Sequence, residues 1–322
     1  MNVLLVRADG IGDALACAPL VAALGAAGHT LGVVLGVRNR DVFARRAFAN
    51  VHVLDRIPWP RHGSTPASRR TALAQARAAR YDVALVASEE IEAYAFGRDA
   101  RIPRRVGFMN GFAKPLKSLY VRTLLTAALV RPASAARARE HEVETLFRLG
   151  ATLFDETRPT SDPARLRPLV LDEPATPHGA IALQLSHKLA GDGLDAAAYA
   201  ALAETLGSRG RDVLLLGDDP ELVAAVARSS GARAQGDLDL AGWKNAIGGA
   251  LALVTPDSGA AHVAGMLGVP CVDCFAASPA VAQEVVRWRP WASPYRALVL
   301  ERPRGSEATA IPIAAALDEL LT

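Results

Sequence analysis

Two polar turns hold the residues whose types and spacing could do chemistry. The first, Arg7-Ala-Asp-Gly-Ile-Gly-Asp13, follows the apolar run Val3 to Val6 and places two glycines and a carboxylate before a predicted helix. The second, Thr255-Pro-Asp-Ser-Gly-Ala-Ala-His262, follows the apolar run Ala250 to Val254. Backbone N–H groups point outward where a helix begins, and they attract anions. The second turn is therefore a candidate anion site, and the glycines of the first let a ligand approach the backbone closely.

The second turn has the residues of a helix start. Asp257 and Ser258 are favourable N-cap residues, and Gly259 permits a tight turn before the predicted helix from Ala260 to Leu267. His262 follows Ser258 by four residues, so both side chains would share one helix face and could reach one bound phosphate. An ordinary strand–turn–helix with a capping acid and a surface histidine has the same residues, so this turn alone leaves both interpretations open.

The first turn partly imitates a nucleotide-binding signature and does not complete it. Gly10-Ile-Gly12 begins a dinucleotide fingerprint, but Leu15 stands where the third glycine is expected. The GxxxxGK[ST] sequence of a P-loop does not occur in the chain. Asp13 is then either a simple N-cap or a general base that faces a ligand at the carboxyl end of its strand. The residues alone leave both roles open.

Alternating apolar runs and helical segments must position these turns. Strands are predicted at 3–6, 30–35, 51–54, 83–87 and 106–108, and again at 180–185, 213–216, 250–254, 269–275 and 297–300. Helices are predicted between most of them, including one over 41–48 and one that Pro19 kinks or shortens. The pattern loosens between Arg98 and Arg139, and a proline-rich stretch over 158–178 separates the two halves. The alternation predicts an α/β fold with two Rossmann-like domains and a cleft between them.

Composition limits the class of protein. With 322 residues, 51% of them hydrophobic and 21% charged, the chain is globular and long enough for two domains. Its net charge of +3 does not indicate a nucleic-acid partner. Three cysteines argue against a disulfide framework, and Cys271 and Cys274 are predicted to be buried thiols in a strand. The absence of a signal peptide and of a bilayer-spanning run predicts a cytoplasmic protein, while the basic stretch from Arg101 to Lys117 leaves contact with an anionic membrane surface open.

Together the two turns resemble glycosyltransferase family 9, the bacterial ADP-heptose:lipopolysaccharide heptosyltransferases. The likeness lies in Arg7…Gly10-x-Gly12-Asp13…Pro19 and in Thr255-Pro-Asp-Ser-Gly-Ala-Ala-His262-x-Ala264…Gly268-Val-Pro270, whose order and separation agree over nearly the whole chain. The resemblance implies a GT-B fold, with an acceptor-binding domain over 1–160, a linker over 161–178 and a nucleotide-sugar domain over 179–305. It also implies that a helix over 306–322 returns to the first domain.

The resemblance assigns roles to individual residues. Asp13 matches the family's catalytic base. Glu221 falls where an acid holds the ribose hydroxyls, and Leu240 ends the segment where adenine is expected to rest. The loop around the donor diphosphate corresponds to four residues of the second turn: Asp257, Ser258, Gly259 and His262.

One departure from the family concerns a cation. Family members carry a lysine shortly before a Trp-Pro at the start of the second domain's first helix. The corresponding positions here hold Asp192, Leu194 and Asp195. Lys188, two residues after Ser186, is predicted to supply the same charge to the donor phosphates from the preceding loop.

The implied reaction is an inverting transfer of heptose from ADP-heptose to a lipopolysaccharide-core or related acceptor, either an anionic saccharide or a lipid-linked one. Asp13 would take the proton of the acceptor hydroxyl, ADP would leave as product, and neither a metal nor another cofactor is expected. Four residues are expected on the acceptor side: Gly12, Arg61, Arg104 and Arg105. Two alternatives stay open: the same fold with another nucleotide-sugar donor or acceptor, and a non-catalytic nucleotide- or glycan-binding homologue. Peripheral contact with the cytoplasmic face of the inner membrane would suit such an acceptor, and no oligomeric state is predicted.

Overall fold

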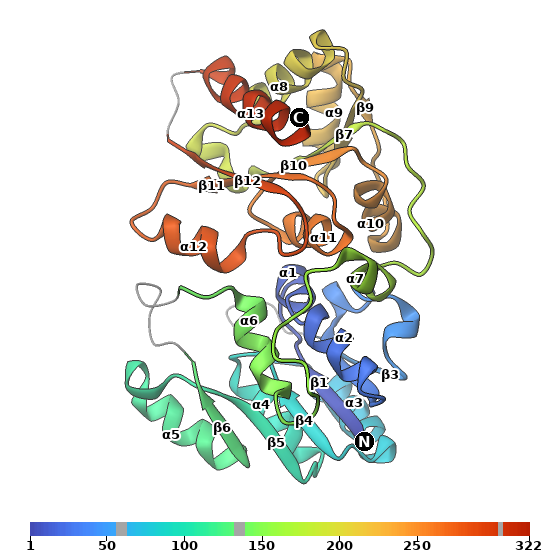
Figure 1. Ribbon diagram of the computed structural model, residues 1–322, viewed down its shortest axis with the longest axis vertical. Helices are drawn as coiled ribbons and strands as arrows, with labels where there is room; N and C mark the ends of the chain where they lie inside the picture. The colour runs from blue at the N-terminus through green and yellow to red at the C-terminus, as the bar shows by residue number, and fades with distance from the viewer. Residues whose placement is uncertain (56–62, 132–138, 302–304) are drawn as a thin grey trace. The chain divides into compact units, whose positions relative to one another are not determined.

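The chain forms two compact units. The computed structural model describes residues 1–55, 63–131, 139–301 and 305–322. The units are Met1–Ser161 and Asp162–Thr322, each with a parallel sheet and helices around it (Figure 1). The boundary between them lies inside the predicted proline-rich stretch. The α/β class and the two Rossmann-like halves are confirmed.

The first unit is built on a six-stranded parallel sheet in the order β3-β2-β1-β4-β5-β6. Its strands are β1 (Asn2–Val6), β2 (Thr30–Gly36), β3 (Asn50–Leu54), β4 (Val83–Val86), β5 (Arg104–Met109) and β6 (Ala127–Val130). The central strands β1 and β4 are buried apolar runs, because helices cover both faces of the sheet. Strand addition changes direction between β1 and β4, and open α/β sheets bind their ligands beyond the carboxyl ends at such a point.

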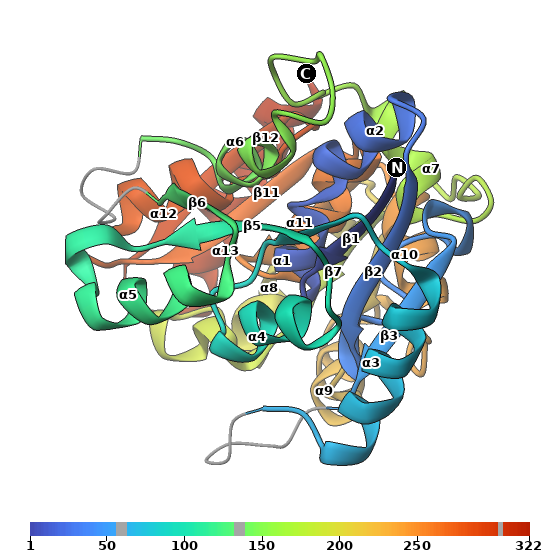
Figure 2. The same ribbon diagram turned by 90° about the horizontal axis from the view of Figure 1, so that it is seen from below.

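Helices cover the two faces of the first sheet. They are α1 (Ile11–Leu15), α2 (Ala18–Ala26), α3 (Pro66–Ala79), α4 (Ile91–Asp99), α5 (Pro115–Leu124) and α6 (Glu142–Phe147), with 3-10 turns η1 (Val37–Asn39), η2 (Arg45–Ala47), η3 (Gly111–Ala113) and η5 (Arg148–Gly150). Side chains of α3, α4 and α5 form one core with β1, β2 and β4. Figure 2 shows α3 and α4 on this side of the sheet and α2, which contacts α6, on the other.

The second unit repeats the architecture of the first. Its six parallel strands follow the order β12-β11-β10-β7-β8-β9, so that the direction of strand addition changes between β7 and β10. The strands are β7 (Ile181–Gln184), β8 (Val213–Leu216), β9 (Arg233–Ala234), β10 (Ala252–Pro256), β11 (Cys271–Ala276) and β12 (Tyr295–Leu300). In both units the first and fourth strands are neighbours, which makes their carboxyl ends the place to look for a site.

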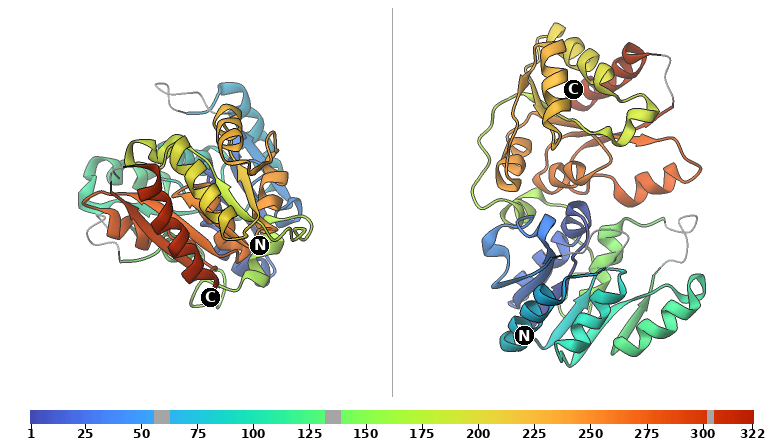
Figure 3. Two further views of the ribbon diagram at one scale, coloured as in Figure 1. Left: turned by 90° about the horizontal axis from the view of Figure 1, so that it is seen from above. Right: turned by 180° about the vertical axis from the view of Figure 1, so that it is seen from behind.

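The helices of the second unit are α7 (Pro163–Val170), α8 (Ala196–Ser208), α9 (Pro220–Ser230), α10 (Leu240–Gly248), α11 (Gly259–Leu267), α12 (Val281–Trp288) and α13 (Ser306–Leu321), with the 3-10 turn η6 (His187–Asp192). One core joins α8, α9 and α13 to a single face of the sheet. Helices α8 and α13 lie side by side, yellow-green and red in both views of Figure 3.

Two parts of the predicted domain organisation are corrected. The last helix was expected to return to the first unit, but α13 belongs to the second, where buried Ile313, Ala314 and Leu317 pack in the core with α8. The stretch 161–178 was expected to be a linker only. It contains α7, capped by Asp162 and packed on α11, because Leu166 and Val170 give it an apolar face.

Some of the other local predictions from the sequence are confirmed, and others are wrong. Pro19 does separate the helix at 11–26 into α1 and α2, with the proline in the first turn of α2. The helix predicted over 41–48 is wrong, because this segment buries Val42, Phe43 and Ala44 in an irregular turn and only η2 is helical. The cysteines are buried and free, as predicted. The sequence patterns missed β6, β9, α5, α7 and α12.

Candidate functional site

In the first unit, Arg7 connects the two strands at the change of direction. It follows β1, is 3% exposed, and donates from Nη1 to the backbone oxygen of Ala87, the residue after β4. Its Nη2 lies 2.5 Å from Oδ1 of Asp13, and its Nε lies 3.3 Å from Oδ2 of Asp9. One buried guanidinium therefore holds two carboxylates at the carboxyl edge of the first sheet.

Asp13 is the more accessible of these carboxylates. Its side chain is 35% exposed, and its second oxygen accepts from the backbone N–H of Gly10 at 3.3 Å, in the first turn of α1. Asp9 is 20% exposed and accepts from the Ser88 hydroxyl at 2.8 Å. Asp13 is exposed enough to contact a substrate, whereas the less exposed Asp9 holds Arg7 and Ser88 in place.

The pKa values of Asp9 and Arg7 are both raised, but for different reasons. Burial raises the pKa of Asp9 above its ordinary value, although Arg7 and Ser88 oppose the shift. Burial alone would lower the pKa of Arg7, but Cys17, Asp9 and Asp13 together raise it. Arg7 is thus a fixed positive charge beside Asp13.

Asn39 fixes the backbone of the first turn. Its Nδ2 donates to the backbone oxygens of Asp9 at 3.1 Å and Gly10 at 3.3 Å, and its Oδ1 accepts from the Gly36 N–H at 2.7 Å. The buried amide therefore ties the loop after β2 to the loop after β1. This support holds the start of α1, and with it Asp13, in place.

In the second unit, Lys188 and Asp257 meet at the corresponding place. Lys188 lies in η6 after β7, and Asp257 directly follows β10. The Lys188 Nζ is 3.0 Å from Oδ2 of Asp257 and also donates to its backbone oxygen. Ser186 caps η6 by accepting from the Lys188 N–H at 3.2 Å. The structure thus brings together the loop cation and the anion turn that the sequence analysis selected.

The turn itself is the start of α11. Ser258 is its N-cap and accepts from the Ala260 N–H at 3.3 Å, while Thr255 Oγ1 lies 3.1 Å from the Ser258 hydroxyl. Gly259 is the first helical residue. His262 is only 5% exposed and meets Trp288 edge to face, with 5.8 Å between ring centres. The helix start therefore offers N–H groups, a hydroxyl and a nearby ammonium to an anion.

Two further predicted donor residues begin helices on the same edge of the second sheet. Glu221 lies in the first turn of α9 and is exposed; the N-cap Asp219 accepts from its N–H at 2.9 Å. Hydrogen bonds from the Leu222 N–H and from His187 lower the pKa of Asp219. Leu240 is the first residue of α10 and is partly exposed. These positions follow β8 and β9, on the side of the sheet where Lys188 lies.

The structure does not bring the predicted acceptor residues together. Gly12 is buried in α1 beside Asp13, and Arg61 lies outside the described residues. Arg104 and Arg105 begin β5, level with Val83 and Ala84 at the start of β4, and so lie at the amino edge of the sheet. The guanidinium of Arg105 donates to the backbone oxygens of Leu124 and Ile102, and Arg104 donates to Thr152. Both arginines therefore lie at the edge of the sheet opposite to Asp13, which follows the carboxyl edge.

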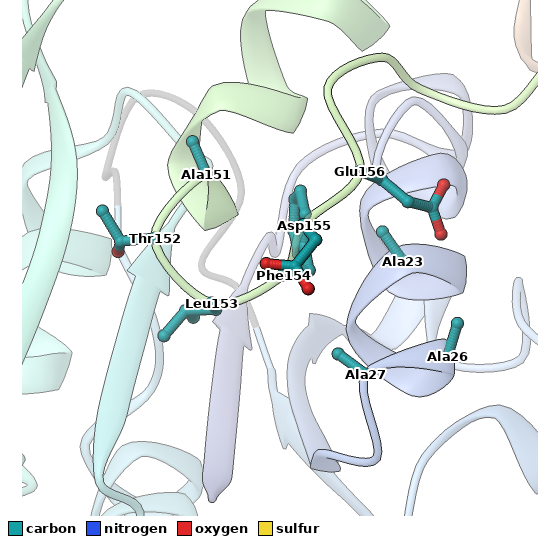
Figure 4. Close-up of a pocket in the computed structure, with 9 residues that line it drawn as sticks. All are labelled: Ala23, Ala26, Ala27, Ala151, Thr152, Leu153, Phe154, Asp155 and Glu156. Carbon is teal, nitrogen blue, oxygen red and sulfur yellow. The ribbon is translucent and has the colours of Figure 1, made fainter.

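A pocket on the surface of the first unit lies away from these groups. Figure 4 shows it between the last turns of α2, which contribute Ala23, Ala26 and Ala27, and the loop 151–156. Since α2 ends just before β2 begins, the pocket is at the amino edge of the sheet. Its position gives it no part in the chemistry of Asp13.

Sequence reasoning missed the residues that support the site. Arg7 was noted only as part of a motif, and Asp9, Asn39 and Ser88 were not selected. Their one signal is position, since each follows a central strand at its carboxyl end. Among the described residues, no group of three or more His, Cys, Asp or Glu side chains is arranged to hold a metal ion.

Comparison with known proteins identifies the family. The model of glycosyltransferase family 9 (heptosyltransferase) matches residues 70–310 of the chain. The chain belongs to glycosyltransferase family 9. No curated protein matches it in sequence.

Solved structures of this family have the same fold. The structure of E. coli heptosyltransferase WaaC with ADP superposes with a TM-score of 0.76 at 18% identity, covering 99% of this chain and 100% of that one. E. coli ADP-heptose lps heptosyltransferase II gives a TM-score of 0.71 at 20% identity, covering 100% and 98%. A putative UDP-N-acetylglucosamine 2-epimerase from Listeria monocytogenes gives 0.55 at 15% identity, covering 98% and 88%. The two-unit architecture is that of GT-B glycosyltransferases, and nucleotide-sugar epimerases share it more distantly.

One structural finding bears on membranes. Within the described ranges, no helix combines the length and the apolar character needed to cross a bilayer.

Proposed function

We propose that this family 9 protein transfers heptose from ADP-heptose, with inversion, to an anionic saccharide of the lipopolysaccharide-core type. The observation that carries the proposal is the pairing of Lys188 with Asp257 at the start of α11. It supplies a cation and a helix amino terminus at one point, which is the chemistry that a leaving diphosphate needs. The solved WaaC structures with ADP and with ADP-2-deoxy-2-fluoro heptose support the choice of donor nucleotide.

The second unit is proposed to hold the donor. Negative charge grows on the diphosphate as its bond to the anomeric carbon breaks, and Ser258, the N–H groups of α11 and Lys188 would stabilise it. His262, which lies within α11, is proposed to belong to the same diphosphate-binding loop. Losing one such donor group typically costs about 3 kcal/mol of transition-state stabilisation. Glu221 is proposed for the ribose hydroxyls, and Leu240 for a face of adenine.

The first unit is proposed to supply the base. Asp13 would accept the proton of the acceptor hydroxyl as that oxygen attacks the anomeric carbon from the face opposite to the diphosphate. A carboxylate is a weak base, and Asp13 is paired with the Arg7 guanidinium. A weak base is sufficient here, because the hydroxyl becomes strongly acidic as the new bond forms and proton transfer occurs late.

The acceptor is proposed to be anionic and to meet cations other than Arg104 and Arg105. Arg38 lies in η1 after β2, on the same edge of the sheet as Asp13, and is exposed. Its neighbour Asn39 contacts the turn that precedes Asp13. An exposed guanidinium at this place suits a phosphate or carboxylate of a saccharide.

Product analysis tests the proposal. The protein is incubated with ADP-heptose and a core-oligosaccharide acceptor, ADP release is followed, and the anomeric configuration of the product is determined by NMR. We expect ADP release that depends on the acceptor, an inverted linkage, and full activity in EDTA, since Lys188 and the α11 N–H groups supply the positive charge. Transfer from UDP-sugars in place of ADP-heptose would contradict the donor. Binding of ADP without any turnover would favour the non-catalytic alternative.

A further inference from the structure

The turn η3 and the helix α5 carry an apolar face that points away from the core. Leu116, Leu119 and Tyr120 are 84%, 67% and 47% exposed, and their spacing places them on one side of the helix. Phe112 in η3 is fully exposed. These four side chains form the outward face of the segment.

The helix is anchored from its opposite side. Val121 and Leu124 are 1% exposed and belong to the core that α3 and α4 also enter. Ser118 donates to the backbone oxygens of Gly111 and Lys114, which fastens η3 to α5. The outward apolar residues therefore belong to a helix that is held in place from its other side. They are not part of the described hydrophobic cores.

The outward face extends onto the edge of the sheet. Val130 of the edge strand β6 is 59% exposed, and a methyl group added to Gly111 would lie 3.6 Å from one of its Cγ atoms. Figure 1 and Figure 2 both draw α5 and β6 at this border of the first unit. The patch thus includes a helix, a turn and a strand edge, and exposed apolar patches of this kind usually mark interaction sites.

The chain segment that carries the patch has charges of one sign. The whole chain has a net charge of +3, but residues 100–139 contain nine Lys and Arg residues and no Asp or Glu. Lys114 and Arg122 are exposed on the segment that carries the outward face. Lys117 is partly exposed, 4.0 Å from Glu89. A segment whose charged residues are all cations, interspersed with apolar and aromatic side chains, is typical of those that lie in the interface of anionic bilayers.

We infer that the outward face, with Val130 and the cations Lys114 and Arg122, docks the protein on bilayers that contain anionic lipids. Phe112, Leu116, Leu119 and Tyr120 would enter the boundary between headgroups and acyl chains, and the two cations would lie among the phosphates. The inference does not rest on the proposed transfer reaction, since it uses only the surface of the first unit. It gives a definite location to the membrane contact that the sequence left open.

Vesicle flotation tests the inference on the full-length protein. Vesicles of phosphatidylethanolamine with phosphatidylglycerol are compared with phosphatidylcholine alone, at low and at high salt. We expect binding to the anionic vesicles that weakens in salt, and little binding to phosphatidylcholine. Leu116→Ser with Leu119→Ser should weaken binding at least tenfold, and Lys114→Glu with Arg122→Glu by more than about 25-fold, since each adjacent cation contributes about fivefold.

The controls separate docking from other effects. Ile311→Ser removes an exposed apolar side chain of α13 and should leave flotation unchanged. Every variant should keep the wild-type melting temperature, because the altered side chains are exposed. No flotation of the wild type overturns the inference, as does wild-type binding by the serine variant. Loss of a dimer in sedimentation, without a change in flotation, would assign the patch to self-association and also overturn it.

Discussion

The Lys188 ammonium and the Asp257 carboxylate lie 3.0 Å apart, and they join the loop after β7 to the start of α11. Because the charges of Lys188 and Asp257 offset each other, these two side chains add little net charge at the start of α11. An incoming diphosphate would therefore meet a carboxylate already compensated by an ammonium, and it could share that ammonium. In the proposed scheme, this arrangement would let a lysine upstream of the family's usual place serve the anion turn.

Removing the Lys188 ammonium should weaken ADP binding. A hydrogen bond to a charged group contributes about 1.5–3 kcal/mol, so Lys188→Ala should raise the Kd for ADP about 10- to 100-fold. Titration calorimetry measures the change. Arg209→Ala, which removes a cation paired with Asp318 on α13, is the matched control and should bind ADP normally. Equal Kd values for the two variants would exclude Lys188 from the donor site.

Asp13→Asn should abolish most of the turnover and spare donor binding. A general base contributes about 10²–10⁴ to the rate, and the amide cannot accept the proton. The variant should keep its Kd for ADP, because Asp13 and the donor loop belong to different units. Steady-state ADP release measures the effect, with Asp41→Asn, an exposed acid of the same unit, as control. Turnover near the wild-type level would remove Asp13 from the mechanism.

Gly265→Ala should destabilise the second unit. Gly265 lies in α11, where an added Cβ would stand 2.7 Å from the Trp291 nitrogen and 3.1 Å from the Pro290 Cα. Backbone atoms cannot move aside as a flexible side chain does, so we expect a loss of about 1–3 kcal/mol in the free energy of unfolding. Gly207→Ala in α8 meets nothing within 4 Å and should instead gain up to about 1 kcal/mol. Urea unfolding of both variants checks the signs, and equal effects would refute the close packing.

Asp273 should make stability fall as pH rises. It is fully buried in β11, and neither carboxyl oxygen has a hydrogen-bond partner among the described residues. Burial raises its pKa well above the ordinary value, Asp257 raises it further, and Lys188 opposes them. Because the folded pKa is the higher one, the unfolded chain loses this proton first. The resulting loss in the free energy of unfolding is absent below about pH 4. Above that pH it grows by up to about 1.4 kcal/mol per pH unit, until the pKa of Asp273 in the folded protein is reached.

The neutral variant Asp273→Asn isolates this effect. The difference in unfolding free energy between variant and wild type should shift in favour of the variant from pH 4 to pH 7, as followed by urea unfolding at several pH values. Asp273→Val should stabilise the unit at pH 7, since it removes the buried polar group as well. A difference that does not change with pH would mean that Asp273 does not titrate in this range.

The sequence was most informative where burial is complete. The runs Val3 to Val6 and Ala252 to Val254 are buried on both faces, so they are apolar throughout and lie in predicted strands. The edge strands β6 and β9 are largely exposed and carry no such signal. Helix α5 was missed because both of its faces are apolar, which removes the helical period from the pattern.

The site was only partly predictable. The turns at Asp13 and Asp257 could be found because glycines and capping residues have to follow a central strand. The partners of Asp13 could not, because spacing along the chain does not show that Arg7 would turn toward both Asp9 and Asp13. The location of Arg104 and Arg105 could have been predicted, since residues that precede a strand lie at the amino edge and not at the ligand edge.

Each unit encloses a core of its own: one joins β1, β2 and β4 to α3, α4 and α5, and the other joins the second sheet to α8, α9 and α13. Among the residues that the structure describes, these two cores share no side chain. In the proposed scheme, substitutions that alter recognition of the acceptor leave the nucleotide-binding half intact. A lineage built on this plan can acquire a new saccharide target while it keeps an old sugar donor.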